Sequence, residues 1–153
     1  ADLKICESPN GITTLGLGSC VGIAIRDTVI KIGGLAHIML PDSTQIRNSQ
    51  YNLAKFADTG IVELVSLLEK KGALRRNMVA KIAGGATMFQ IQAKTDIILV
   101  GERNVEATKK KLNELAIRII AEDTGLNYGR TVTFFPETGE FRIRAVGKGE
   151  TVI

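Results

Sequence analysis

The fold class is decided by residues 12–39, which read ITTLGLGSCVGIAIRDTVIKIGGLAHIM. This stretch is rich in Ile, Val and Leu, carries few charges and is interrupted by glycines. Apolar runs of this kind are typical of strands that pack on both faces. We therefore expect strands at 12–16, 20–26 and 30–39.

Two segments further along the chain have apolar residues at helical spacing. The first helix is expected at about 52–71, despite Gly60, and the second at about 104–115. Short apolar runs predict further strands at 79–83, 97–100, 117–121, 131–135 and 141–146, with a turn at 136–139 joining the last two. This pattern favours an α+β fold, an α/β sandwich of mainly antiparallel β-sheet with helices packed on it. No linker or repeat divides the chain, so residues 1–153 are expected to form a single domain.

Composition and charge narrow the class of function. The chain has 153 residues, of which 44% are hydrophobic, and a formal net charge of +4 from 20 basic and 16 acidic residues. Its basic clusters are not interleaved with aromatic residues, so we expect no nucleic-acid binding. No apolar stretch approaches the roughly 18 residues of a membrane span, and no secretory signal is recognisable. We therefore expect a cytoplasmic protein without direct membrane insertion.

Metal and cofactor sites find little support in the sequence. Cys6, Cys20 and the only histidine, His37, are too few for the usual zinc spacings, so no metal site is expected. The glycines of residues 16–18 lack the third glycine of a dinucleotide fingerprint, and residues 84–86 lack the Lys-Ser or Lys-Thr of a P-loop. We therefore expect no cofactor and interpret both cysteines as thiols.

Cys20 and His37 suggest a nucleophilic site. If residues 20–26 and 31–37 form a hairpin with a two-residue turn at 28–29, Cys20 lies opposite His37, with Cβ atoms roughly 4.5–5.5 Å apart. A slip of one residue would place the two side chains on opposite faces. A histidine beside a thiol can serve as its base or counter-ion. The spacing therefore predicts a reactive cysteine.

The residues around this pair supply the other requirements of such a site. The hydroxyl of Thr14 would fix the orientation of the imidazole. Gly16 and Gly18 let the backbone turn sharply, and N–H groups at Gly18, Ser19 and Cys20 would stabilise an oxyanion. Each residue also has an ordinary explanation, because a lone cysteine is most often a small buried hydrophobe and a glycine-rich segment is often only a turn. Packing, or a bystander thiol, is the role expected of Cys6.

Several blocks of the sequence resemble, in order, the chemoreceptor glutamine deamidase family CheD. The blocks are TLGLGSC at 14–20, AHIMLP at 36–41, KFADT at 55–59, KIAGGATMF at 81–89, GERNV at 101–105, EDTG at 122–125 and GR at 129–130. The resemblance implies an α/β sandwich similar to the catalytic domain of deamidating bacterial toxins, with a triad of Cys20, His37 and Thr14. One departure is Leu126, where the family commonly has a second glycine.

The resemblance also implies a reaction and two partners. The thiolate of Cys20 would attack a glutamine side-chain amide, His37 would protonate the departing ammonia, and hydrolysis of the thioester would leave glutamate. The implied substrates are glutamines on the methylation helices of chemoreceptors, and the implied partner is the chemotaxis phosphatase CheC, which such proteins bind and stimulate. Two alternatives remain open. One is a non-catalytic regulatory partner of the phosphatase, and the other is a different thiol enzyme for acyl transfer or proteolysis.

Overall fold

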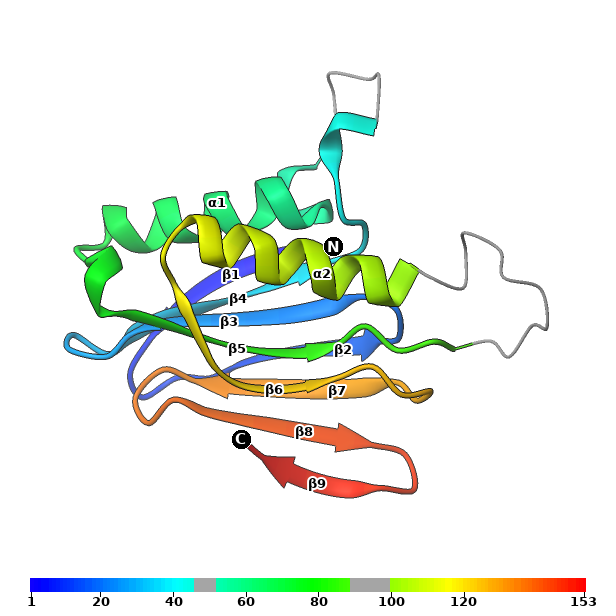
Figure 1. Ribbon diagram of the computed structural model, residues 1–153. Coiled ribbons are helices and arrows are strands. Elements are labelled where there is room, and N and C mark those ends of the chain that lie inside the picture. The colour runs from blue at the N-terminus through cyan, green and yellow to red at the C-terminus, as the bar shows by residue number, and fades with distance from the viewer. Residues whose placement is uncertain (46–51, 89–99) are drawn as a thin grey trace.

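The computed structural model describes residues 1–45, 52–88 and 100–153, which are arranged in three layers (Figure 1). The strands are β1 (Asp2–Glu7), β2 (Ile12–Leu17), β3 (Val21–Asp27), β4 (Ile32–Ile38), β5 (Met78–Gly84), β6 (Arg118–Thr124), β7 (Arg130–Phe135), β8 (Glu140–Ala145) and β9 (Gly149–Val152). The helices are α1 (Ala57–Lys70) and α2 (Val100–Glu114), with 3-10 turns η1 (Ser43–Gln45), η2 (Leu53–Lys55) and η3 (Arg75–Asn77).

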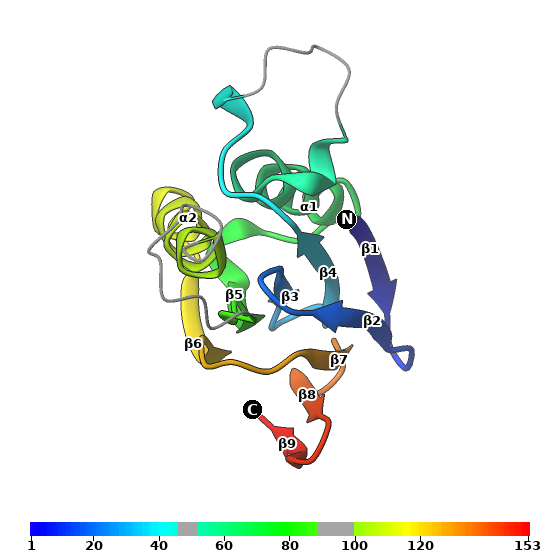
Figure 2. The same ribbon diagram turned by 90° about the vertical axis from the view of Figure 1, so that its right-hand side faces the viewer.

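Two sheets and two helices make up the layers. One sheet has the order β1-β4-β3-β5-β6, and the other has the order β2-β7-β8-β9. All described pairings are antiparallel except β5 with β6, which are parallel and are connected through α2. Figure 2 shows α1 and α2 on one side of the five-stranded sheet and the four-stranded sheet on the other. The expected α+β sandwich of mainly antiparallel sheet is confirmed.

The five-stranded sheet has a hydrophobic core on each face. Val21, Ile23 and Ile25 of β3 belong to the core beneath the helices, whereas Ala24 belongs to the core between the two sheets. All four side chains are almost inaccessible to solvent. A strand covered on both faces reads as a continuous apolar run, which is why the sequence of β3 lacks a polar alternation.

The boundaries of several elements differ from the expectation. The first helix is shorter, because Phe56 has extended dihedrals (φ −112°, ψ 143°) that separate η2 from α1. Gly60 lies inside α1 as expected, and Gly72, at φ +98°, follows its end. In the strand expected at 97–100, residues 97–99 lie outside the described part of the chain, and Val100 begins α2.

The hairpin between β3 and β4 corrects the predicted pairing of Cys20 with His37. The partner of His37 is Gly22, and the last pair of the ladder is Val21 with Ile38. The connection is longer than the expected two-residue turn because the Asp27 carboxylate accepts the N–H groups of residues 29 and 30, at 2.8 and 3.1 Å. The register is therefore displaced by two residues. Since side chains alternate with a period of two, position 20 keeps the same face as His37.

Candidate active site

The imidazole of His37 lies between the two sheets. His37 belongs to β4, where its backbone neighbours are Asp2 of β1 and Gly22 of β3. Its Nδ1 atom forms a hydrogen bond of 2.8 Å with Oγ1 of Thr14, which comes from β2 of the other sheet. Both residues are half-buried. One sheet therefore carries the imidazole, and the other carries the hydroxyl that orients it.

A β-bulge in β2 explains how Thr14 reaches this position. The register of β2 against β7 shifts between Thr14 and Leu17, so that Leu15 and Gly16 together occupy the place of one residue. Gly16 has φ +71°, a conformation that favours glycine. Because of the extra residue, Thr14 and the fully buried Leu17 both point into the space between the sheets.

Cys20 lies in the connection between β2 and β3. It is half-buried and packs against the core between the sheets, on the face that carries His37. The ladder between β3 and β4 ends at the pair of Val21 with Ile38, so Cys20 lies one residue beyond the strand that pairs with His37. No hydrogen bond joins the two side chains, both of which are among the described residues. The structure thus brings Thr14 and His37 into contact and places the thiol on the same face.

Three successive carbonyl groups hold the backbone around Cys20. The carbonyls of residues 18–20 accept hydrogen bonds from the Ala86 N–H (2.9 Å), the Asn104 Nδ2 (2.9 Å) and the Gly85 N–H (2.8 Å), respectively. In a trans peptide the following N–H points away from the carbonyl. The N–H groups of residues 19 and 20 are therefore directed away from these partners. The Gly18 N–H, by contrast, donates to the carbonyl of residue 16 at 3.0 Å.

Two glycines that pack beside the Cys20 loop, Gly84 and Gly85, were not predicted from the sequence to support the site. Gly84 has φ +111°, and a Cβ atom there would overlap the carbonyl oxygen of Cys20. Gly85 has φ +67°, and its Cβ would overlap the side chain of Val105 on α2. By their types alone, residues 84–86 exclude a phosphate-binding loop and indicate no other role. Their presence in a family block was the signal that could have indicated a site role.

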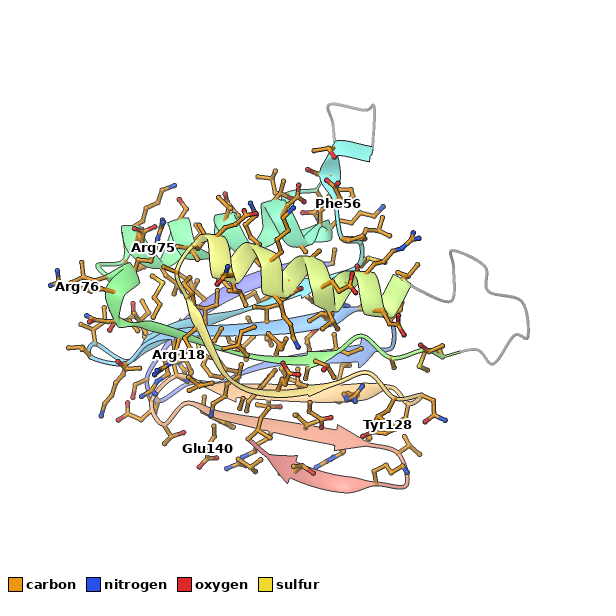
Figure 3. All side chains as sticks on the ribbon, viewed as in Figure 1. Phe56, Arg75, Arg76, Arg118, Tyr128 and Glu140 are labelled. Atoms are coloured by element: carbon orange, nitrogen blue, oxygen red, sulfur yellow. The ribbon has the colours of Figure 1, made fainter. Side chains whose placement is uncertain are left out.

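The connection between β6 and β7 packs next to residues 84–86. Arg130 is buried, donates to Oδ1 of Asp123 at 3.1 Å and lies over the ring of Tyr128, with 4.5 Å to the ring centroid. In Figure 3 Tyr128 lies at the opposite end of the molecule from Arg75 and Arg76. The basic residues of η3 are therefore remote from this connection.

Burial determines the charges of the thiol and the imidazole. Desolvation raises the pKa of Cys20 above its usual 9.0 and lowers the pKa of His37 below its usual 6.5. Both groups are therefore neutral at pH 7. An unprotonated imidazole can accept the proton of a thiol, so the arrangement supports a general base and a nucleophile rather than a preformed ion pair.

Cys6 also packs against the core between the sheets but lies in a different segment of the chain from Cys20. It lies on β1, is half-buried, and its Sγ atom is 3.5 Å from the carbonyl oxygen of Asn10. Burial raises its pKa, and its sheet partner is Gly33.

Within the described ranges no three His, Cys, Asp or Glu side chains lie close enough to hold a metal ion. In the same ranges no helix is long and apolar enough to cross a membrane.

Comparison with known proteins gives consistent results. Residues 39–145 match the family model described as CheD chemotactic sensory transduction, a range that begins after Cys20 and His37. The chain is 59% identical to the probable chemoreceptor glutamine deamidase CheD of Lachnoclostridium phytofermentans, and 51% identical to the chemoreceptor glutamine deamidase CheD of Halalkalibacterium halodurans. Each comparison covers 100% of this chain and 94% of the relative, so the region around Cys20 is included. The chain therefore belongs to the CheD family.

Proposed function

We propose that this protein is a chemoreceptor glutamine deamidase that uses a thioester on Cys20. The observation that carries the proposal is the hydrogen bond between Thr14 and His37, which crosses from one sheet to the other on the face where Cys20 lies. Family membership supports the substrate, because the relatives are named for deamidation of chemoreceptor glutamines.

The first half of the reaction forms the thioester. The Nδ1–H of His37 donates to Oγ1 of Thr14, which leaves the Nε2 lone pair as the base. The Sγ–H proton of Cys20 moves to Nε2 while sulfur bonds to the glutamine Cδ, and the amide oxygen becomes an oxyanion. The N–H groups of Ser19 and Cys20 donate to this oxyanion. As the oxyanion collapses, the C–N bond breaks and the imidazolium proton leaves with ammonia.

The second half consumes one water molecule. His37 accepts a proton from water, and the resulting hydroxide bonds to the thioester carbon. The C–S bond then breaks, the product is a glutamate side chain, and the proton on His37 returns to sulfur. The site is regenerated, the new carboxylic acid releases its proton to water, and one neutral amide on the receptor has been replaced by a carboxylate.

The phosphatase CheC is the second partner in the proposal. The support is the family resemblance alone, and the proposed CheC surface overlaps the surface near Cys20 that a receptor helix must reach. Receptor binding then weakens phosphatase binding by the same factor as the reverse. A competition titration follows deamidation of a receptor fragment as phosphatase is added. Undiminished deamidation at saturating phosphatase would show that the two partners use separate surfaces.

The decisive experiment is incubation of the purified protein with a receptor cytoplasmic fragment in water labelled with oxygen-18. Mass spectrometry of the digested fragment should show glutamines converted to labelled glutamates, and Cys20→Ala should give none. Addition of a primary amine separates hydrolysis from acyl transfer, because an acyl-transfer enzyme would form the substituted amide instead. Unchanged glutamines with the wild-type protein, together with binding of the phosphatase, would favour the non-catalytic regulatory partner.

A further inference from the structure

The side chain of Asn104 joins the two segments that carry the nucleophile and the base. Asn104 lies in the second turn of α2 and is completely buried. Its Nδ2 atom donates to two backbone carbonyls, that of Ser19 at 2.9 Å and that of Met39 at 2.9 Å. Ser19 immediately precedes Cys20, and Met39 is the second residue after His37.

The sheet alone does not hold these two segments together. The ladder between β3 and β4 ends at the pair of Val21 with Ile38. Beyond that pair the chains continue into Cys20 and Met39, which form no further rung. Figure 1 shows that α2 begins at the end of the molecule where β5 ends. The Asn104 amide therefore connects the two segments just beyond the last pair of the ladder.

Asn104 supplies two hydrogen bonds at a cost to its own amide oxygen. The Oδ1 atom of Asn104 is buried and has no hydrogen-bond partner in the described structure, which costs free energy. An apolar side chain of similar volume would avoid that cost but would leave the carbonyls of Ser19 and Met39 without this donor. What an apolar side chain cannot do is donate to two carbonyls at once. The distinctive contribution of Asn104 is thus the pair of hydrogen bonds.

We propose that Asn104 is a positioning residue that sets the spacing between the Cys20 thiol and the His37 imidazole. This inference rests on the proposed function. Without the amide, the carbonyl of Ser19 loses its partner while those of residues 18 and 20 keep theirs, so the loop stays attached but the thiol shifts relative to the base. A misplacement of about 1 Å in an active site can cost about a hundredfold in rate. The effect falls on turnover, because Asn104 is buried and cannot touch a receptor helix.

The test compares Asn104→Leu with Thr108→Val. Thr108 lies one turn further along α2, is also completely buried, and has a hydroxyl without a hydrogen-bond partner in the described structure. Its substitution therefore controls for loss of a buried polar group on this helix face. We expect Asn104→Leu to lower kcat for a receptor fragment by about 10- to 100-fold, with KM within about twofold of the wild-type value. Thr108→Val should leave both constants unchanged.

A second measurement does not depend on the receptor. In a Cys6→Ala background, the rate of iodoacetamide alkylation of Cys20 near pH 7 reports assistance by His37. Asn104→Leu should reduce this rate to that of His37→Ala, and Thr108→Val should not. If Asn104→Leu does not fold, Asn104→Ala replaces it in both assays, since the smaller side chain places no new atoms in the core.

The two measurements separate the inference from the proposed function. Failure of the wild-type protein to deamidate would refute the function, while slow alkylation in the folded Asn104 variant would still support the coupling. Wild-type alkylation in a folded Asn104 variant would overturn the inference. A raised KM with unchanged kcat would also overturn it, because that result assigns Asn104 to substrate binding.

Discussion

The hydrogen bond between Thr14 and His37 permits a quantitative prediction. Thr14→Val keeps the shape of the side chain but removes the hydroxyl 2.8 Å from Nδ1. Leaving an imidazole N–H without its acceptor costs about 1–3 kcal/mol, which corresponds to about 5- to 150-fold in rate. Both residues are half-buried, so water can partly replace the hydroxyl. We therefore expect kcat to fall by about 5- to 30-fold, the lower part of that interval. Turnover should remain measurable.

The matched control for Thr14→Val is Thr13→Val. Thr13 is the preceding residue of the same strand, is exposed, and forms a hydrogen bond of the same length, 2.8 Å, with Thr133 on the other face of the sheet. Ammonia release from a receptor fragment, measured under saturating substrate, compares the two variants directly. Thr13→Val should match the wild-type protein. If the two variants lose the same activity, or if Thr14→Val loses none, the orienting role of Thr14 is refuted.

Three further predictions concern the nucleophile, the base and Gly84, which packs against the loop that carries Cys20. Cys20→Ala should abolish ammonia release, whereas Cys6→Ala should leave the rate close to normal; the opposite result would move the site. Because burial lowers the pKa of His37 below its usual 6.5, the midpoint of the acid-side decline in kcat/KM should lie below pH 6.5. A midpoint above pH 6.5 would contradict His37 as the base. Gly84→Ala should lower the melting temperature and abolish turnover, whereas Gly72→Ala, at φ +98° with open space around its Cβ, should affect stability alone. Equal activity of these two variants, measured on folded protein, would argue against the contact with Cys20.

Apolar patterns in the sequence predicted the most buried elements but missed two strands at the sheet edges. β3 and α1 bury apolar residues on one or both faces, and their sequences predicted them. β1 and β9 were not predicted. β1 is an edge strand whose residues alternate between exposed and half-buried positions, and all residues of β9 are exposed. Such strands depend on pairing with a neighbour, which a local pattern does not contain.

The sequence predicted those parts of the candidate site that depend on residue types and on the strand face that each side chain occupies. The predicted pairing of Cys20 with His37 was wrong by two residues, yet the two side chains share a face, because a displacement of two preserves the alternation. The supporting residues were not predictable in this way. Asn104 acts on Ser19 from 85 positions away in the chain, and Gly84 is required by the approach of the Cys20 carbonyl. Both contacts form only when the layers of the fold pack together.

The proposed catalytic geometry depends on the packing between the two sheets. His37 is fixed by the five-stranded sheet, Thr14 by the four-stranded sheet, and Cys20 by the connection that passes from one to the other. Neither sheet alone holds more than part of the arrangement. Because protein interiors are close-packed, a change in the core between the sheets, such as one at Leu17, shifts Thr14 relative to His37. The core between the sheets therefore constrains the contact of Thr14 with His37, and α2 adds a separate constraint through the hydrogen bonds of Asn104.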